Sequence, residues 1–422
     1  MYKSGLYCGL IALILSSCID IPRPYSKIPP GIWKGTLVLE DDPKSNKNDL
    51  VLPFNFEIDY IDENVIMTII NAKEKIVVKE ITFSQDRSTG RDSIFIDFPL
   101  YDTRIEAEYK DNVIQGFWYV HYRENYKVPF IARHGVAERF KNATPPSQDI
   151  SGEWNVKIDI ETESEYPALG DFKQEGNKLT GTFMTETGDY RYLEGVVSGN
   201  ELFLSCFDGA HAFYFDGKVL ESGNILGRFF SGLHYKTNWT AVKNGKNDMV
   251  NAYEFSKLKN DQEPVTFSFP NTEGELVTPN SDKYKGKPKI VKLMGTWCPN
   301  CLDETNFLLD YLKNNPNKQI DIIALAFERY RDSDKAIAII KRYKEKKKIP
   351  YEMLYAGYYD KEEATKTFKM LKKIKSYPTL IFLDKNNMVR KIYTGFSGPA
   401  TKEYQTFTKD FDKIVTQLLD EE

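Results

Sequence analysis

The sequence predicts a multidomain protein in which two tandem antiparallel all-β modules, each a barrel or a sandwich, precede an α/β domain. Three observations lead to this fold class. Short runs that alternate apolar and polar residues fill positions 31–245, and three short motifs recur within them. From position 262 onward, apolar runs of strand length alternate with segments of helical periodicity. Period-2 alternation is typical of half-buried strands, and strand–helix alternation is typical of an α/β domain.

Length and composition agree with this organisation. A chain of 422 residues corresponds to about three domains. The 41% share of hydrophobic residues is sufficient for real cores and excludes wholesale disorder. A formal net charge of -4 argues against a nucleic-acid partner, which would require a basic field. A mean hydropathy of -0.48 excludes a multi-span membrane protein.

The first residues have the pattern of a targeting segment. Lys3 supplies a positive charge, residues 5–15 form an apolar run too short for a stable membrane anchor, and small residues precede Cys18. This pattern resembles a bacterial lipoprotein signal, in which cleavage precedes an acylated cysteine; an ordinary secretory signal is the alternative. We therefore expect a signal peptide over residues 1–17 and a lipid on Cys18. A Pro-rich tether over residues 18–30 would favour an extended conformation.

The two β modules are expected over residues 31–145 and 146–245. Each would be a meander of about eight strands, closed or nearly closed to avoid exposed edges. Recurrence of three motifs in the same order with similar spacing indicates a tandem duplication. Trp33 and Trp154 occupy equivalent positions and are interpreted as core anchors, with ligand binding as the weaker alternative. The recurring motifs are Gly31–Ile32–Trp33–Lys34 and Gly152–Glu153–Trp154–Asn155, Ser93–Ile94–Phe95–Ile96 and Glu201–Leu202–Phe203–Leu204, and Ile114–Gln115–Gly116–Phe117 and Ile225–Leu226–Gly227–Arg228.

The α/β domain is expected over residues 262–422, after a polar, Lys- and Asn-rich linker at 242–262. Apolar runs predict its strands and amphipathic periodicity predicts its helices, one of which Ser333 would cap. The expected strands are 289–294, 320–327, 379–383 and 389–394, and the expected helices are 301–314, 334–346, 361–373 and 402–419.

The chemistry is expected at Trp297–Cys298–Pro299–Asn300–Cys301, where a strand ends and a helix begins. The N-terminus of a helix stabilises a thiolate at the first cysteine. The second cysteine, one turn later, is placed to resolve a mixed disulfide. Cys298 is therefore the predicted nucleophile and Cys301 the resolving thiol of a redox-active Cys298–Cys301 disulfide.

The other cysteines and the histidines are given no chemical role. Cys8 would be lost with the signal peptide, and Cys206 alternates with aromatic residues, as a buried inert thiol would. The sequence has no second Cys pair and no histidine after His234, which makes a zinc site improbable and leaves copper delivery without its downstream histidine. We expect no metal and no cofactor. The remaining histidines share no ligand spacing: His121, His134 and His211.

The segment from Gly286 to Cys301 resembles the thioredoxin fold and, more narrowly, TlpA/ResA-like thiol–disulfide oxidoreductases of bacterial envelopes. Ser376–Tyr377–Pro378–Thr379 is similar to the cis-proline loop of that family, and residues 266–275 are similar to its N-terminal hairpin. The resemblance covers about residues 262–422. It implies that Tyr377 and Pro378 lie against the Cys pair and present backbone groups to a substrate peptide. Trp297 and Pro299 would be supporting residues of the same site.

Peroxiredoxins share this fold, but their peroxidatic motif has a threonine three residues before a single cysteine. Position 295 is glycine, so the sequence does not support that activity.

Two charged residues have competing interpretations. Lys292 occupies the strand position at which thioredoxins keep a buried acid; its ammonium could depress a thiol pKa, but a lysine that extends to solvent at a strand end is favoured. Glu304 lies three residues after Cys301, where relatives carry a similar acid. It could shuttle protons, but a favourable charge at the helix N-terminus is the safer interpretation.

The expected function is an envelope thiol–disulfide oxidoreductase, with reductase the favoured direction, which faces the periplasm and is held to a membrane by lipid. Its partners would be protein thiols and disulfides, with a membrane electron donor or acceptor and no nucleic acid. The β modules would position substrate proteins or dock a partner. The alternative is a lipid-anchored binding or adaptor protein whose β repeats capture a ligand or partner.

Overall fold

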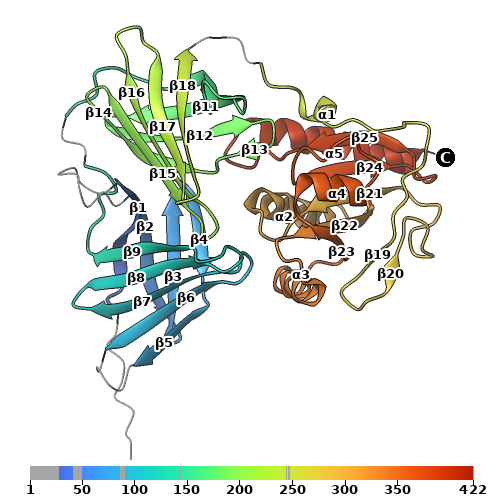
Figure 1. Ribbon diagram of the computed structural model, residues 1–422, viewed down its shortest axis with the longest axis horizontal. Coiled ribbons are helices and arrows are strands. Elements are labelled where there is room, and N and C mark those ends of the chain that lie inside the picture. The colour runs from blue at the N-terminus through green and yellow to red at the C-terminus, as the bar shows by residue number, and fades with distance from the viewer. Residues whose placement is uncertain are drawn as a thin grey trace, which may run out of the picture.

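The computed structural model describes residues 28–40, 50–85, 91–141, 144–243, 245 and 248–421. The expected signal peptide, Cys18 and most of the Pro-rich tether lie outside these residues. The described chain forms two β modules and a C-terminal α/β domain (Figure 1). Within the described ranges, no helix combines the length and the apolar character that a membrane crossing requires.

The first module is an open, curved sheet of nine antiparallel strands. These strands are β1 (Gly31–Glu40), β2 (Leu50–Ile61), β3 (Asn64–Asn71), β4 (Glu74–Val78), β5 (Ile81–Gln85), β6 (Asp92–Phe98), β7 (Thr103–Lys110), β8 (Val113–Val120) and β9 (Lys127–His134). Their order in the sheet is β4-β3-β2-β1-β9-β8-β7-β6-β5. Because β4 and β5 form the two edges without pairing with each other, the module is a half-barrel.

The second module is a closed barrel. Its strands are β10 (Gly152–Ile158), β11 (Tyr166–Glu175), β12 (Lys178–Thr185), β13 (Gly188–Asp189), β14 (Leu193–Ser198), β15 (Glu201–Phe207), β16 (Ala212–Val219), β17 (Ile225–Ser231) and β18 (Tyr235–Lys243). Their order is β11-β10-β18-β17-β16-β15-β14-β12-β13, and an additional β11–β12 pairing closes the ring. Closure removes the edges that an open sheet would expose.

The recurring motifs occupy corresponding strands of the two modules. In both modules the first strand pairs with the last, β1 with β9 and β10 with β18. Trp33 and Trp154 lie at the same place in these first strands and are almost completely buried. Each indole Nε1 donates a hydrogen bond to the carbonyl four residues earlier, at 3.1 Å to Pro29 and at 2.8 Å to Ile150. The core-anchor interpretation of both tryptophans agrees with this geometry.

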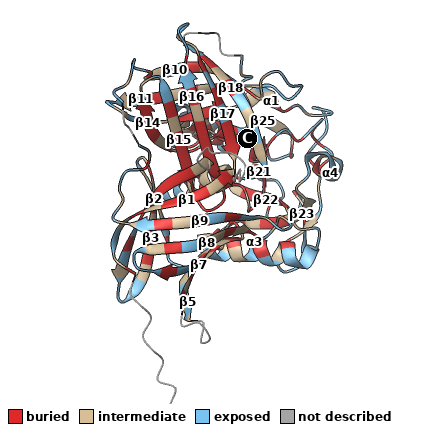
Figure 2. Cartoon of the chain, turned by 60° about the vertical axis from the view of Figure 1, so that its left-hand side comes forward, coloured by how far each residue is buried: buried red, intermediate tan, exposed pale blue. Residues whose placement is uncertain are grey.

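Residues of the second module fill the opening of the first. Phe207, at the end of β15, is completely buried in the core of the half-barrel. Its ring centroid lies 4.5 Å from that of Phe54 and 5.3 Å from that of Trp118. Asn71 Nδ2 also donates to the Phe207 carbonyl at 2.9 Å. In Figure 2, buried residues run along β15 to β17 and along β1 and β2, which fits a core shared by the two modules.

The C-terminal domain contains a five-stranded mixed sheet flanked by helices. Its strands are β21 (Lys289–Met294), β22 (Asp321–Glu328), β23 (Glu352–Tyr358), β24 (Thr379–Leu383) and β25 (Val389–Thr394), and its helices are α2 (Pro299–Asn314), α3 (Ser333–Lys347), α4 (Lys361–Thr367) and α5 (Glu403–Asp420). The order is β23-β22-β21-β24-β25, in which β21 is parallel to β22 and antiparallel to β24. A short hairpin of β19 (Phe269–Pro270) and β20 (Leu276–Val277) precedes it.

The structure corrects three local expectations for this domain. Helix α4 ends at Thr367 instead of residue 373, because the following backbone pairs with the linker: Leu258 bridges Leu371. The linker is therefore not a free connection, and it also contains α1 (Ala252–Phe255). Asp332 instead of Ser333 caps α3, since its side chain accepts from the backbone N–H of Lys335 at 2.9 Å.

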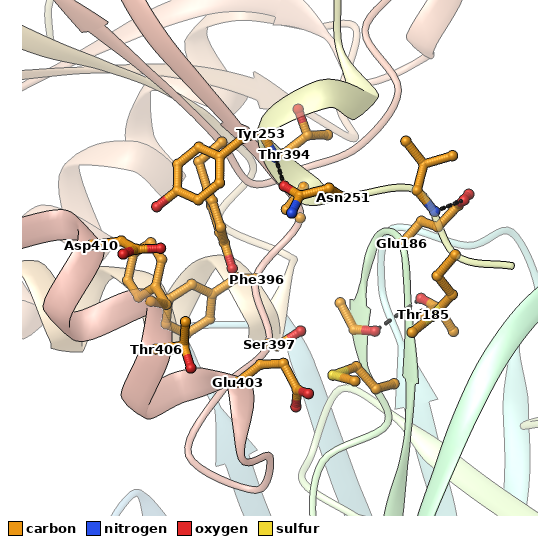
Figure 3. Close-up of a pocket in the computed structure, with 18 residues that line it drawn as sticks. Thr185, Glu186, Asn251, Tyr253, Thr394, Phe396, Ser397, Glu403, Thr406 and Asp410 are labelled. Atoms are coloured by element: carbon orange, nitrogen blue, oxygen red, sulfur yellow. Dashed lines mark hydrogen bonds between the residues drawn. The ribbon is translucent and has the colours of Figure 1, made fainter. Parts of the chain in front are cut away.

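A cavity of about 410 Å³ lies where the linker, the second module and α5 meet (Figure 3). Glu186 contributes its carboxylate from the second module and accepts from the Val250 backbone N–H at 2.8 Å. Tyr253 lines it from α1 and Asp410 from α5. No cysteine lines this cavity, so it is separate from the predicted reaction centre.

Phe207→Ala is expected to destabilise the protein by about 3–5 kcal/mol, because it leaves a cavity in a closely packed aromatic core. Urea unfolding followed by tryptophan fluorescence measures the loss. Leu226→Ala is the control, since Leu226 is 47% exposed on β17 and its truncation should cost about 0.5 kcal/mol or less. Equal losses in the two variants would contradict a shared core.

Candidate active site

The two cysteines of the Trp-Cys-Pro-Asn-Cys motif lie at the N-terminus of α2. Cys298 is the N-cap residue, and its Sγ accepts a hydrogen bond from the Cys301 backbone N–H at 3.3 Å. Pro299 occupies the start of the helix, where its missing N–H costs nothing. Both cysteines are free thiols; Cys298 is 7% exposed and Cys301 is fully buried. This difference in access fits attack by Cys298 and resolution by Cys301.

The loop before β24 lies directly against Cys298. The Tyr377–Pro378 peptide bond is cis, and the Tyr377 carbonyl oxygen is 3.6 Å from the Cys298 Sγ. The Tyr377 hydroxyl donates to the Tyr359 carbonyl at 3.2 Å, which fixes the ring beside the motif. The structure therefore brings together the residues that the resemblance to the thioredoxin family implied.

Trp297 explains why position 295 is glycine. The indole Nε1 donates to the Phe327 carbonyl at 3.0 Å. A Cβ added at Gly295 would lie 2.2 Å from that nitrogen, closer than real Cβ contacts occur. A side chain at 295 would therefore require the Trp297 indole to shift.

Lys292 and Glu304 form a buried ion pair behind Cys301, contrary to both favoured interpretations from sequence. Both side chains are 0% exposed, and the Lys292 Nζ lies 3.2 Å from a carboxylate oxygen of Glu304. Lys292 also donates to the Cys301 carbonyl at 3.0 Å and to the Thr305 hydroxyl at 2.8 Å. Lys292 therefore does not extend to solvent. Glu304 is oriented toward the domain interior, because its counter-ion is there.

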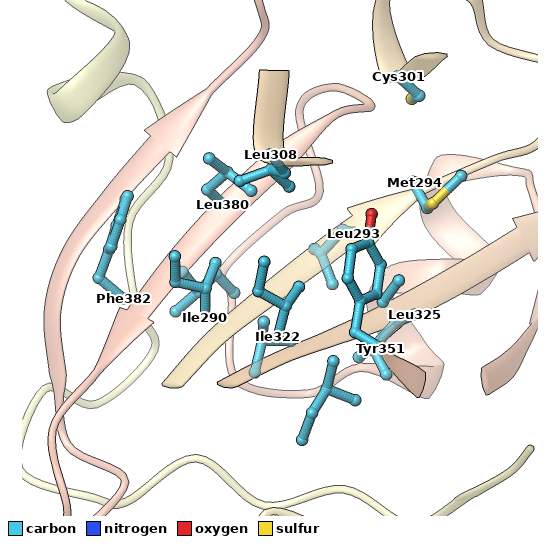
Figure 4. Packing of buried hydrophobic residues seen from close by; sticks show 14 of the residues in the cluster. Ile290, Leu293, Met294, Cys301, Leu308, Ile322, Leu325, Tyr351, Leu380 and Phe382 are labelled. Atoms are coloured by element: carbon cyan, nitrogen blue, oxygen red, sulfur yellow. The ribbon is translucent and has the colours of Figure 1, made fainter. Parts of the chain in front are cut away.

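This ion pair alters the electrostatics of the resolving thiol. Burial raises the pKa of Cys301 well above its ordinary value, Cys298 raises it further, and the Lys292 ammonium opposes the shift. Burial also raises the pKa of Glu304 to about 7, again against the effect of Lys292. Figure 4 shows Cys301 with Met294 and Leu308 in the apolar core that causes these shifts.

Two further residues at the end of β22 belong to the site and were missed from sequence. Glu328 is buried and accepts from the Thr296 backbone N–H at 3.0 Å and from its hydroxyl at 2.8 Å. Burial raises the pKa of Glu328 to about 7. Arg329 places its guanidinium 4.2 Å from the centroid of the Trp297 ring. The sequence did contain a signal for this part of the site, because these two charged residues end an apolar strand that lies beside the cysteine strand.

The second module covers the dithiol. Asn300 donates from its side chain to the Asp189 carbonyl at 3.4 Å, and the Ser376 hydroxyl donates to the Thr187 carbonyl at 3.2 Å. A Cβ at Gly188 would lie 1.9 Å from the Asn300 Nδ2, so the close approach requires glycine there. A pocket of about 240 Å³ remains over Cys298, between the modules and the C-terminal domain.

The remaining cysteine and the histidines have the following positions. Cys206 is fully buried in the core of the barrel, as expected, and burial raises the pKa of its thiol well above the ordinary value. His211 lines the pocket over Cys298, although sequence gave it no role; its Nδ1 lies 3.3 Å from Asp208. Within the described ranges, no group of three or more His, Cys, Asp or Glu side chains is placed to hold a metal ion.

The comparisons with solved structures each cover part of this chain. A thiol:disulfide interchange protein of the thioredoxin family from Chlorobium tepidum TLS is 22% identical over 38% of this chain and 99% of its own, with a TM-score of 0.28. A thiol-disulfide oxidoreductase from Bacteroides fragilis is 16% identical over 35% of this chain and 98% of its own, with a TM-score of 0.27. No curated protein matches the chain.

The AhpC/TSA family model matches residues 261–392. This range contains the dithiol, the cis-proline loop and four of the five strands of the sheet in full. The chain therefore carries a domain that matches the AhpC/TSA family model, preceded by a half-barrel and a barrel.

Proposed function

We propose that the protein is a thiol–disulfide oxidoreductase of the TlpA/ResA-like type that exchanges disulfides with protein substrates through Cys298 and Cys301. One observation carries this proposal. The Cys298 Sγ accepts from the Cys301 N–H at the start of α2 and faces the carbonyl of the cis-proline loop at 3.6 Å. The sulfur therefore lies at the end of α2 where the backbone N–H groups of the first turn lack helical partners. The match to the AhpC/TSA family supports a redox enzyme.

In the reducing direction, the Cys298 thiolate attacks one sulfur of the substrate disulfide. A bond forms between Cys298 and that sulfur, the substrate S–S bond breaks, and the leaving thiolate takes up a proton. The Cys301 thiolate then attacks the Cys298 sulfur and releases the second substrate thiol. The substrate gains two electrons and two protons, and the dithiol becomes the Cys298–Cys301 disulfide.

Lys292 acts through Cys301 in the second step. Cys301 must lose its proton inside an apolar core, and the Lys292 ammonium lowers its pKa against the effect of burial, more than the Gly295 backbone does. Glu304 holds Lys292 in this place by the 3.2 Å ion pair. Both are therefore positioning residues rather than reacting groups.

The cell envelope is the proposed location. Lys3, the apolar run at 5–15 and Cys18 support a lipid anchor that holds the domain on the periplasmic side of a membrane. A dithiol that acts there as a reductase becomes oxidised in each cycle, so it needs a membrane electron donor. Thiols in an oxidising compartment are otherwise converted to disulfides.

Equilibration of purified protein with glutathione is expected to show a reversible Cys298–Cys301 disulfide with a reduction potential between about -270 and -120 mV. A value near the lower limit would support the reductase direction, and one near the upper limit would indicate a disulfide donor or isomerase. Cys298→Ser should abolish exchange, and Cys301→Ser should trap the mixed disulfide. Cys206→Ala, which removes the third described cysteine, should leave the reduction potential of the Cys298–Cys301 pair unchanged. Absence of a reversible disulfide would contradict the enzyme and favour the binding protein.

Lys292→Gln is expected to cost about 3–5 kcal/mol of stability at pH 8, because it leaves the Glu304 carboxylate buried without its counter-ion. The cost should be smaller at pH 5. Burial raises the pKa of Glu304 from 4.5 to about 7, so at pH 5 this group is neutral in the folded protein. As the pH rises, Glu304 ionises, and the buried charge without its counter-ion then destabilises the variant. Urea unfolding at the two pH values measures the difference.

The control is the double variant Lys292→Gln/Glu304→Gln, which removes both charges and should recover most of the lost stability at pH 8. A single-variant loss that is equal at pH 5 and pH 8, or a double variant as unstable as the single one, would disprove the coupling.

A further inference from the structure

The pocket over Cys298 is walled by aromatic rings from all three parts of the chain. It has a volume of about 240 Å³, enough for a small group and not for a folded segment. The Thr187 carbonyl of the second module accepts from the Ser376 hydroxyl, so the module covers this side of the site. The pocket is the space that remains between the module and the Cys298 sulfur. The aromatic residues that line it are Tyr122, Tyr190, Phe213, Trp297 and Tyr377.

Two cationic side chains line the same pocket, and neither forms an ion pair with a carboxylate of the residues that the structure describes. The Arg329 guanidinium lies between rings of the first module and the C-terminal domain, 4.5 Å from the Tyr122 centroid and 4.7 Å from that of Tyr359. Its Nε is buried and has no hydrogen-bond acceptor in the described structure. Lys361, at the start of α4, forms no ion pair with any residue that the structure describes. A buried N–H donor without an acceptor is costly, and on a guanidinium an anion normally satisfies it.

The acidic groups around the pocket are already engaged. Asp189 accepts from the backbone N–H groups of Gly398 and Arg191. Asp360 caps α4 by accepting from two backbone N–H groups at 3.0 Å. The Glu328 carboxylate is held by Thr296, as described above. Among the described residues, none of these carboxylates forms an ion pair with Arg329 or Lys361, and both cations line the pocket beside the sulfur.

We propose that this pocket selects thiols and disulfides that carry a carboxylate close to the reacting sulfur, and that Arg329 and Lys361 bind that carboxylate. The inference rests on the proposed function, since it names the chemical class of substrate for the same dithiol. Arg329 and Lys361 outnumber Asp189, the acidic residue that also lines the pocket. An excess of charge of one sign in a cleft with walls of low dielectric constant raises the association rate of ligands with the opposite charge by tenfold or more. Both a small acidic thiol and an acidic segment of a protein have this chemistry.

Stopped-flow oxidation of the reduced protein by three small disulfides tests the proposal. The three are oxidised glutathione, which is anionic, hydroxyethyl disulfide, which is neutral, and cystamine, which is cationic. Each rate constant is divided by that of dithiothreitol with the same disulfide, which removes differences in intrinsic reactivity. At low ionic strength the normalised rate for oxidised glutathione should exceed that for cystamine by at least about tenfold.

The variants separate charge recognition from thiol reactivity. Arg329→Gln and Lys361→Gln should each reduce the ratio of the glutathione rate to the cystamine rate severalfold, whereas Arg329→Lys, which keeps the charge, should retain it. The matched control is Lys341→Gln on the exposed side of α3, which should leave the ratio unchanged. A change in thiolate reactivity alone alters both rates together and leaves the ratio constant.

Two cystine-bridged peptides, with aspartates or with lysines beside the cysteines, distinguish the sources of the carboxylate. Preference for the acidic peptide extends recognition to protein segments, and preference confined to oxidised glutathione restricts it to small molecules; either result supports the proposal. Equal normalised rates within both sets, or a preference that persists in the Gln variants, would overturn it. If no disulfide oxidises the protein, the proposed function fails as well, so the two failures are distinguishable.

Discussion

The buried guanidinium of Arg191 is the interaction on which the arrangement of the three parts depends. It lies between β13 and β14 of the barrel and is 7% exposed. It pairs with Glu74 of the half-barrel, with Asp208 of the barrel at 3.2 Å, and with Asp303 of α2 at 2.7 Å. Burial disfavours its charge, but these three carboxylates together raise the pKa of Arg191 well above its ordinary value. One cation is thus shared by all three parts, and loss of any part leaves buried charge unpaired.

This ion cluster determines what surrounds the reactive sulfur. Asp303 lies two residues after Cys301, so the contact with Arg191 brings the start of α2 under the barrel. The backbone at Asp189 and Gly188 then reaches Asn300 inside the motif. Cys298 is 7% exposed and shares a pocket with rings of both β modules. The β modules are therefore part of the site, which gives a physical reason for their presence in one chain with the dithiol.

Local patterns predicted most of the fold but not the contacts between its parts. The strands at Lys289–Met294, Thr379–Leu383 and Val389–Thr394 have the predicted bounds. The first two are mostly apolar runs, and the third follows the turn at 384–387. The motif and the cis-proline loop were found because they are local. The position of Lys292 was predicted wrongly because its counter-ion, Glu304, lies on a helix that follows in the sequence. Arg329 and Lys361 were missed because they are far apart in the sequence, and only the folded chain brings them to one pocket. Pairings across domains depend on tertiary structure, which periodicity does not encode.

The difference between the two β modules also concerns contacts between parts of the chain. Both modules have nine strands in corresponding order, yet β12 pairs with β14 in the barrel, while β3 pairs with β4 and leaves β5 at the opposite edge of the half-barrel. The opening admits Phe207 and the Asn71–Phe207 hydrogen bond, which a closed ring would exclude. An open sheet is otherwise prone to pair with other chains, so the half-barrel needs its neighbour. The open edge of the half-barrel and the inserted Phe207 therefore join the two modules into the unit that covers the dithiol.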